Sequence, residues 1–270
     1  MIPNVLTIAG SDPSGGAGIQ ADLKAISALG AYGMSVITAL TAQNTQGVRD
    51  IQVIAPAFVA AQIDAIFDDV RVDAVKIGMV ATAEIAAVIA DRLQHHAARN
   101  VVLDPVMVAK SGHRLLAEDA VAAVRDVLVP LARVITPNLP EAAVLLGGAE
   151  PASLAEMRLA VRALHQLGSQ FVLLKGGHLT TDESPDLLFD GRVVTELSSE
   201  RIDTRNTHGT GCTLSAAIAA LLPRHEMVEA VRAAKAYLTG AIAASHRLAV
   251  GSGHGPVHHF HALWAEEAGE

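Results

Sequence analysis

Short aliphatic runs alternate with longer alanine-rich stretches along most of the 270 residues. The runs are rich in Val, Ile and Leu, and the intervening stretches repeat apolar residues with helical period, which is typical of strands joined by crossover helices. Strands are expected at Val5–Ala9, Ser35–Ala39, Ala74–Ile77, Val101–Leu103, Val134–Thr136 and Phe171–Leu174. Because such units build a parallel sheet with helices on both faces, we expect an α/β fold, a three-layer αβα sandwich.

The helical stretches and one hairpin complete this expected architecture. Helices are predicted at Ile19–Leu29, Pro56–Phe67, Ala83–His95, Glu118–Val127, Leu139–Leu146, Leu154–Leu167, Thr213–Leu221 and Met227–Ala244. The segment Asp186–Leu197 has Asp190 and Gly191 at its centre, and this pair predicts a hairpin turn at an antiparallel edge of the sheet. The length suits one domain with a large core, so we expect a single domain over residues 1–270.

Charge and hydropathy exclude several classes of partner. The 20 Lys and Arg against 28 Asp and Glu give a net charge of −8 without a basic stripe, so we expect no nucleic-acid partner. No apolar run approaches the ~20 residues of a membrane helix, and the first residues lack a secretory signal. Cys212 is the single cysteine, which fits a reducing compartment, and we expect a cytoplasmic protein.

The buried runs end abruptly on small or polar residues. In a parallel sheet these ends fall along one edge, where open α/β proteins bind their ligands. The segments that follow the first, fourth, fifth and sixth expected strands are Gly10-Ser11-Asp12, Asp104-Pro105, Thr136-Pro137-Asn138 and Lys175-Gly176-Gly177. We therefore expect the chemistry of the protein to collect at this edge.

The tetrapeptide Gly209–Cys212 precedes an apolar helix. Two glycines allow a tight turn with outward amides at a positive helix end, which suits an anion, although an ordinary glycine-rich helix start has the same pattern. Thr207 and His208 add further donors just upstream. Cys212 falls in the first helical turn, where the helix dipole is expected to lower the pKa of its thiol, whereas a buried inert cysteine is the alternative.

The loop Gly10–Gly18 follows the first expected strand. Its glycine spacing fits neither a dinucleotide fingerprint nor a P-loop, and it is longer than a short strand-to-helix turn requires. The next helix carries Gln20, Asp22 and Lys24, which are either a solvated face or part of a site.

Polar residues after the last two expected parallel strands also have two interpretations. Asn138 and Glu141 have the spacing of a capping box, and a magnesium and phosphate site is the alternative. Lys175 is either an exposed strand-end lysine or a phosphate ligand. The tail containing His258, His259 and His261 lacks the spacing of a zinc site and is expected to pack or lie on the surface.

Seven motifs in order give the chain a resemblance to a known family. It resembles the bifunctional hydroxymethylpyrimidine and phosphomethylpyrimidine kinases of thiamine biosynthesis, members of the ribokinase superfamily. The motifs are Ala9–Asp22, Ala42–Thr45, Lys76–Met79, Ala109–Gly112, Thr136–Ala142, Lys175–His178 and Asn206–Thr213, and the match continues to the tail Gly255–His259.

The resemblance implies an αβα sandwich, a homodimer and two successive phosphoryl transfers from ATP to a small pyrimidine. It implies catalytic roles for Gly209, Thr210, Gly211, Cys212 and Lys175. It places the phosphates and Mg²⁺ beside Asn138, Glu141, Lys175, Thr207, His208, Gly209 and Gly211, with Glu141 at the metal. It places the pyrimidine beside Gly10, Asp22, Gln43, Met79 and Val106. The loop Lys110–Leu115 is expected to close over the site and exclude water.

Two other functions stay open at this point. A pyridoxal kinase would also phosphorylate the hydroxymethyl group of a flat heteroaromatic molecule, and a non-catalytic ligand-binding module would keep the scaffold alone. The wider superfamily usually has an Asp base where this chain has Cys212, which argues against a sugar kinase. The same difference leaves the identity of the base open, because a thiol is an unusual proton acceptor for an alcohol.

Overall fold

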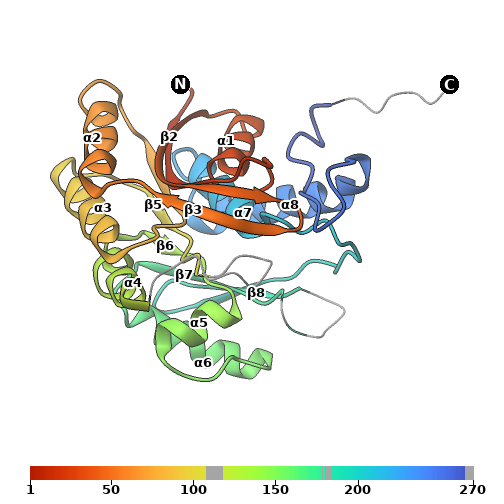
Figure 1. Ribbon diagram of the computed structural model, residues 1–270. Helices are drawn as coiled ribbons and strands as arrows, with labels where there is room; N and C mark the ends of the chain where they lie inside the picture. The colour runs from red at the N-terminus through yellow and green to blue at the C-terminus, as the bar shows by residue number, and fades with distance from the viewer. Residues whose placement is uncertain (108–117, 178, 180–183, 265–270) are drawn as a thin grey trace.

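A computed structural model, which describes residues 1–107, 118–177, 179 and 184–264, has one nine-stranded sheet at its centre (Figure 1). The order is β3-β2-β1-β4-β5-β6-β7-β8-β9, with β3, β8 and β9 antiparallel to their neighbours and the other strands parallel. The strands are β1 Asn4–Ser11, β2 Tyr32–Asn44, β3 Gly47–Val53, β4 Ala74–Ile77, β5 Val101–Leu103, β6 Val134–Ile135, β7 Phe171–Lys175, β8 Asp186–Phe189 and β9 Val194–Leu197.

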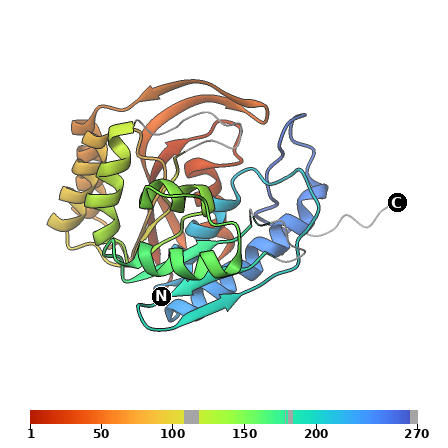
Figure 2. The ribbon, with the colours of Figure 1, turned by 90° about the horizontal axis from the view of Figure 1, so that it is seen from below.

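Helices cover both faces of the sheet, as Figures 1 and 2 show. Apolar residues of α2 to α6 pack on one face, and those of α1, α7 and α8 pack on the other. The helices are α1 Gly18–Ala28, α2 Pro56–Phe67, α3 Ala83–His95, α4 Glu118–Ala123, α5 Leu139–Leu146, α6 Leu154–His165, α7 Thr210–Leu221 and α8 Met227–Ala243. The expected three-layer αβα architecture is therefore confirmed.

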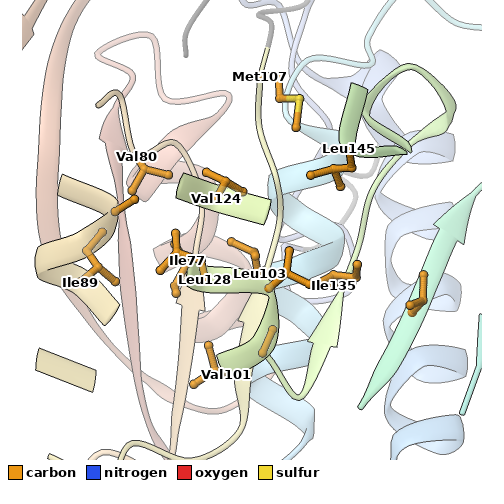
Figure 3. Close-up of a cluster of buried hydrophobic side chains, with 14 of the residues drawn as sticks. Ile77, Val80, Ile89, Val101, Leu103, Met107, Val124, Leu128, Ile135 and Leu145 are labelled. Carbon is orange, nitrogen blue, oxygen red and sulfur yellow. The ribbon is translucent and has the colours of Figure 1, made fainter. Parts of the chain in front are cut away.

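The larger core cluster lies between the sheet and α2 to α6. Ile77, Leu103 and Ile135 come from adjacent strands and gather with Ile89 of α3 and with Leu128 (Figure 3). Leu103 is fully buried, so its replacement by Ala is expected to cost about 2–5 kcal/mol through lost burial and a cavity. This packing holds the strand ends rigidly, which matters because polar residues follow directly.

The opposite face of the same strands changes character toward their carboxyl ends. Side chains alternate between the two faces, so Ala74 and Lys76 of β4 lie on the α7 side, and Val102 and Asp104 follow the same alternation at β5. Lys175 ends β7 on the same side as Leu173. The apolar layer beneath α7 therefore gives way to charged residues at the end of α7 that begins with Thr210.

Most of the expected elements are confirmed, with four main differences. The strand expected at Ser35–Ala39 is longer at both ends and runs over Tyr32–Asn44. β3 was not predicted, because Gly47–Val53 is a largely exposed edge strand without a buried alternation. The helix expected to run to Val127 ends at Ala123 and continues as a wider π turn, Val124–Leu128, which apolar spacing does not distinguish from an α-helix. The helix expected from Thr213 begins at Thr210 instead.

The hairpin predicted at Asp186–Leu197 forms β8 and β9. The loop Lys110–Leu115, the motif Ala109–Gly112 and His178 lie outside the described residues. Within the described part of the chain, no helix has both the length and the apolar character needed to span a membrane.

Candidate active site

A cavity of about 750 Å³ lies at the carboxyl ends of the parallel strands. Its size is within the range of small-molecule sites, and its walls come from strand ends and from α5, α7 and α8. The predicted site residues that line it are Gly10, Gln43, Met79, Val106, Asn138, Glu141, Lys175, Thr207, His208, Gly209, Thr210, Gly211 and Cys212. Of the predicted site residues, all of which the structure describes, only Asp22 does not line it.

The start of α7 has the geometry expected of an anion site. Gly209 caps the helix with a left-handed backbone (φ 77°), and a Cβ there would overlap the carbonyl oxygen of Gly16. Only glycine therefore allows the loop after β1 to contact the helix start. The amide of Thr210 makes a long hydrogen bond to the carbonyl of Thr207 (3.4 Å), and that of Thr213 donates to Gly209. The amides of Gly211 and Cys212 have no helical carbonyl four residues earlier, so they can bind an anion in the cavity.

Gly211 brings this helix start against two charged strand ends. A Cβ on Gly211 would lie 3.3 Å from Lys175 Nζ and 3.4 Å from Asp104 Oδ2. The amides at the start of α7, the Lys175 ammonium and the Asp104 carboxylate therefore lie close together beside Gly211. Such a junction can hold a phosphate chain, because donors and a cation face the space where its oxygens would lie.

Lys175 is part of a buried charge cluster. Its Nζ lies 3.1 Å from Asp104 Oδ1 and 4.0 Å from Glu141 Oε2. Burial lowers the pKa of Lys175, but Asp104 and Glu141 outweigh burial and raise it above its ordinary value. Burial raises the pKa of Asp104, and Lys175 and Lys76 outweigh that effect and hold it below its ordinary value. Lys175 and Asp104 are therefore both ionised at neutral pH.

The capping box predicted at Asn138 and Glu141 is confirmed. Glu141 N donates to Asn138 Oδ1 (2.8 Å) and Asn138 N donates to Glu141 Oε2 (2.8 Å), so a complete capping box starts α5. The same two residues line the cavity. Burial raises the pKa of Glu141 to about 7, opposed by Lys175 and assisted by Asp104.

The expectation that the thiol of Cys212 has a lowered pKa is wrong. Its side chain is partly exposed and lines the cavity, but its thiol pKa is raised to about 11 rather than lowered. Burial is the largest cause, the ammonium of Lys76 opposes it, and the carboxylates Asp22 and Asp104 add to it. Nearby negative charge and burial therefore outweigh the helix dipole, and the thiol is protonated at neutral pH.

The loop after β1 and the residue before α7 form one polar wall. Asp12 accepts hydrogen bonds from the amides of Ser14 and Ala17 and lies 2.8 Å from Nε2 of His208. Burial raises the pKa of Asp12, and the hydrogen bonds from His208 and Ser14 outweigh it, so the carboxyl pKa is below its ordinary value. Nε2 of Gln43 lies 3.4 Å from the same imidazole nitrogen, which places the Gln43 amide at the cavity surface.

An apolar pocket lies beside this wall. Met79 packs with Ala39 and Val106, and a Cβ on Gly10 would lie 3.1 Å from the Met79 sulfur. This pocket suits a flat ring with one polar edge toward Gln43. Asp22 lies outside it, fully buried and paired with Lys76, so the expectation that Asp22 itself lines the pocket is corrected.

The other end of the cavity contains a second buried ion pair. Lys235 of α8 lies 2.6 Å from Asp186 Oδ2 and donates to the carbonyl of Ser184 (2.9 Å). Asp186 also accepts from the amide of Gly176 (3.0 Å), directly after Lys175. This pair therefore holds the backbone that carries Lys175 against α8.

The histidine-rich tail packs onto α7 and α8. His258 and His259 are buried, Nε2 of His259 lies 3.0 Å from Thr213 Oγ1, and the amide of His258 donates to the carbonyl of Ala241. No cluster of three or more metal-ligating side chains occurs among the described residues. The tail thus packs against α7, whose first turn lines the cavity.

Sequence reasoning did not assign roles to Asp104, Lys76 or Lys235. Asp104 had a detectable signal, because it follows a buried strand at the expected ligand edge. Lys76 also had one, since it is the single charged residue of the buried strand β4. Lys235 had none, because a lysine within a long helix is ordinarily exposed.

This chain is similar to known proteins over nearly its whole length. The family described as phosphomethylpyrimidine kinase matches residues 12–258. A Salmonella typhimurium protein named hydroxymethylpyrimidine/phosphomethylpyrimidine kinase is 58% identical over 262 residues, covering 97% of this chain and 98% of the relative.

Two solved structures are also similar. Bacillus subtilis pyridoxal kinase, in an ADP complex, superposes with a TM-score of 0.88 at 40% identity, covering 96% of this chain and 98% of that one. A phosphomethylpyrimidine kinase from Clostridium difficile gives a TM-score of 0.79 at 44% identity, covering 89% and 99%.

Proposed function

The chain belongs to the phosphomethylpyrimidine kinase family, and from this we propose that it phosphorylates 4-amino-5-hydroxymethyl-2-methylpyrimidine in two successive steps of thiamine biosynthesis. ATP supplies both phosphoryl groups, giving first the monophosphate and then the diphosphate. The observation that carries this proposal is the meeting of Gly211, Lys175 and Asp104 at one end of the cavity, next to a pocket for a flat ring.

In the first transfer, the hydroxyl oxygen forms a bond to the γ-phosphorus of ATP. The bond from that phosphorus to the bridging oxygen breaks, and its electron pair leaves with ADP. The amides at the start of α7 and the Lys175 ammonium stabilise the charge of the transferred group. Little covalent chemistry is asked of the protein, so rate depends on positioning.

Cys212 orients the hydroxyl in this scheme. Its thiol, with a pKa of about 11, is a poor base at neutral pH but still donates or accepts a hydrogen bond. In a loose transition state the alcohol proton can leave late, to an oxygen of the transferred phosphoryl group, so no strong base is required.

The donor set around Lys175 fits a magnesium ion held with ATP phosphates. Asp104 and Glu141 are two buried carboxylates near one ammonium, and Mg²⁺ in such enzymes uses one or two carboxylates together with phosphate oxygens. Glu141, whose pKa is raised to about 7, would lose its proton to hold the ion, with Asp104 beside it. Bound Mg²⁺ supplies charge neutralisation between the phosphates.

The ring pocket supports a pyrimidine as the acceptor. Met79 and Val106 would cover its faces, Gly10 leaves room for it, and the Gln43 amide would meet its amino and ring-nitrogen edge. Asn138, Thr207, His208 and Thr210 are further cavity-lining residues for phosphate binding.

The assay is product analysis of the purified enzyme with ATP, Mg²⁺ and the hydroxymethylpyrimidine. We expect monophosphate to appear first and diphosphate to follow, with one ADP per transfer. The Lys175→Met variant serves as the control for catalysis, since it removes only the ammonium. Absence of ADP formation with any acceptor would leave a non-catalytic binding module instead.

Pyridoxal is the second candidate acceptor, because the Bacillus subtilis structure that superposes so well is described as a pyridoxal kinase. Parallel kcat/KM measurements with pyridoxal decide between them. A higher value for pyridoxal than for the pyrimidine would reverse the assignment.

We also propose that the chain forms a single kinase domain, assembles as a homodimer and acts in the cytoplasm. The continuous nine-stranded sheet supports the first, and the single cysteine supports the last. Sedimentation of the purified protein tests the dimer.

A further inference from the structure

A buried ion pair beneath the cavity has no part in the transfer described above. Lys76 Nζ lies 3.0 and 2.8 Å from the two carboxylate oxygens of Asp22, and both side chains are fully buried. Thr7 Oγ1 donates a third hydrogen bond to Asp22 (2.6 Å). Taking two such charges out of water is costly, and apolar replacements of a buried pair are often equally stable, so stability alone explains it poorly.

The pair is oriented with its positive end toward the cavity. Lys76 belongs to the cavity wall, whereas Asp22 lies behind it on α1. Gly78 makes room for the ammonium, because a Cβ there would lie 2.6 Å from Lys76 Nζ. An ammonium has three N–H donors, and within the described residues only Asp22 accepts from it.

Lys76 lies on a different side of the site from Lys175. It lies on β4, between Ala9 of β1 and the Met79 pocket, whereas Lys175 lies on β7. Three strand spacings of about 4.8 Å separate the two strands, or about 14 Å. Both ammonium groups act on Asp104 and Cys212, so Lys76 approaches this junction from the side of the Met79 pocket and Lys175 from the side of Glu141.

The field of Lys76 reaches the reacting region. Its ammonium opposes the rise in the pKa of the Cys212 thiol that burial causes. It also acts with Lys175 to hold the pKa of Asp104 low against the effect of burial. Asp22 acts on the thiol in the opposite sense, but the effect of Lys76 is the larger of the two, so the pair on balance stabilises a negative charge beside Cys212.

The two proposed acceptors differ in charge at that place. The alcohol is neutral, whereas the monophosphate is a dianion at neutral pH. In the second transfer a monophosphate oxygen bonds to the γ-phosphorus, the bond to the bridging oxygen breaks, and the electron pair leaves with ADP; no proton has to be removed. Two polyanions must then approach each other, so positive charge is needed on the acceptor side as well.

We propose that Lys76, held by Asp22, is the positioning residue that admits the anionic monophosphate as an acceptor and so sets the preference between the two transfers. This inference rests on the proposed function. It assigns the lysine of the Lys76–Met79 motif a role in substrate choice.

The decisive variant is Lys76→Met combined with Asp22→Asn. It removes both buried charges together, and the introduced carboxamide keeps an acceptor for Thr7, so the fold is expected to persist. We expect kcat/KM for the monophosphate to fall at least tenfold more than kcat/KM for the alcohol, mainly through KM. The KM for ATP should stay within about twofold.

The matched control is Lys235→Met combined with Asp186→Asn. This second buried lysine–aspartate pair also borders the cavity, but β8 is four strand spacings from β4, about 19 Å. Its loss should lower turnover of both acceptors by the same factor. Equal losses for the two acceptors in the Lys76 and Asp22 double variant would overturn the inference.

The single variant Asp22→Asn is an isosteric second test; because it leaves the Lys76 ammonium buried without its carboxylate, its folding is checked by a thermal melt before rates are measured. It leaves the ammonium less neutralised, with Asp104 still nearby, so preference should shift toward the monophosphate. An unchanged or opposite shift would count against the role of Lys76. If the wild-type enzyme makes monophosphate but never diphosphate, the proposed second transfer is wrong. If it makes both products and every variant keeps the wild-type ratio of kcat/KM for the two acceptors, only this inference is wrong.

Discussion

Replacement of Glu141 by Gln separates the proposed magnesium-binding role of this carboxylate from its effect on stability. Burial raises its pKa from an ordinary value of 4.5 to about 7. Between these values the folded protein keeps a proton that the unfolded chain has lost, so stability falls as pH rises from about 4.5 to 7 and stays low above 7. Gln carries no charge at any pH and still accepts the hydrogen bond from Asn138 N.

The expected size follows from the difference between the two pKa values. At about 1.4 kcal/mol per pH unit, it amounts to about 3 kcal/mol of destabilisation above pH 7. We therefore expect Glu141→Gln to melt at a higher temperature than the wild type at pH 8, by about 6 °C, and to differ little at pH 5. The same variant should lose most of its Mg²⁺-dependent turnover.

Thermal melts of the ligand-free proteins between pH 5 and 8.5 measure this effect. Glu156→Gln is the matched control, because Glu156 accepts from Ala152 N at the start of α6 but is exposed. Addition of Mg²⁺ and ATP should stabilise the wild type and not Glu141→Gln. A variant that is less stable than wild type at pH 8, with no pH dependence in the difference, would refute the reasoning.

Substitutions at three further positions test the site. Gly211→Ala should lower kcat by about 10²–10³ while pyrimidine affinity holds, because its methyl group would lie against Lys175 and Asp104 where the phosphates are proposed to bind. Gly148→Ala, in open space, should be silent in the same assay. Gln43→Glu should weaken pyrimidine binding by about 1–3 kcal/mol and leave ATP binding unchanged, and equal losses in the two calorimetric titrations would remove Gln43 from recognition. Cys212→Ser should keep partial activity and Cys212→Ala less, and detection of phosphate on Cys212 by mass spectrometry would contradict direct transfer.

The fold was largely predictable because the buried strands and helices have strong apolar periods. The ends of α2, α3 and α5 fall at the predicted residues, where Pro56, Thr82 and Asn138 mark the helix starts. β3 escaped prediction since an exposed edge strand is stabilised by pairing with β2 rather than by its own burial. The residues of β3 alone do not indicate this pairing.

The site was predictable where it lies on strand ends and loops, and less so where it depends on depth. Gly209 and Lys175 line the cavity, and this placement could be predicted because their positions follow from element boundaries. The thiol of Cys212 was misjudged, because its pKa depends on Asp22, Asp104 and burial, which come from distant segments. How deeply a side chain is buried depends on how the whole chain packs, so it cannot be predicted from the residues at one helix start.

The protonated thiol of Cys212 becomes understandable when both acceptors are considered together. A carboxylate at this position, as the resemblance implies for sugar kinases, would accept the proton of an alcohol but repel an anionic monophosphate. A neutral thiol does neither, and the second transfer has no acceptor proton to remove. The residue therefore suits an enzyme that must accept an alcohol and then its phosphate.

This argument predicts opposite effects of Cys212→Asp on the two transfers. Relative to Cys212→Asn, which has the same shape without the charge, the Asp variant should keep or gain turnover with the alcohol and lose at least tenfold with the monophosphate. Burial, Asp22 and Asp104 raise the pKa of the thiol and would raise that of an added carboxyl too, so initial rates with each acceptor are measured across pH 6–9 to include the ionised form. If the Asp and Asn variants show the same ratio of the two rates, the charge at residue 212 does not select the acceptor, and the choice of a thiol over a carboxylate needs a different physical cause.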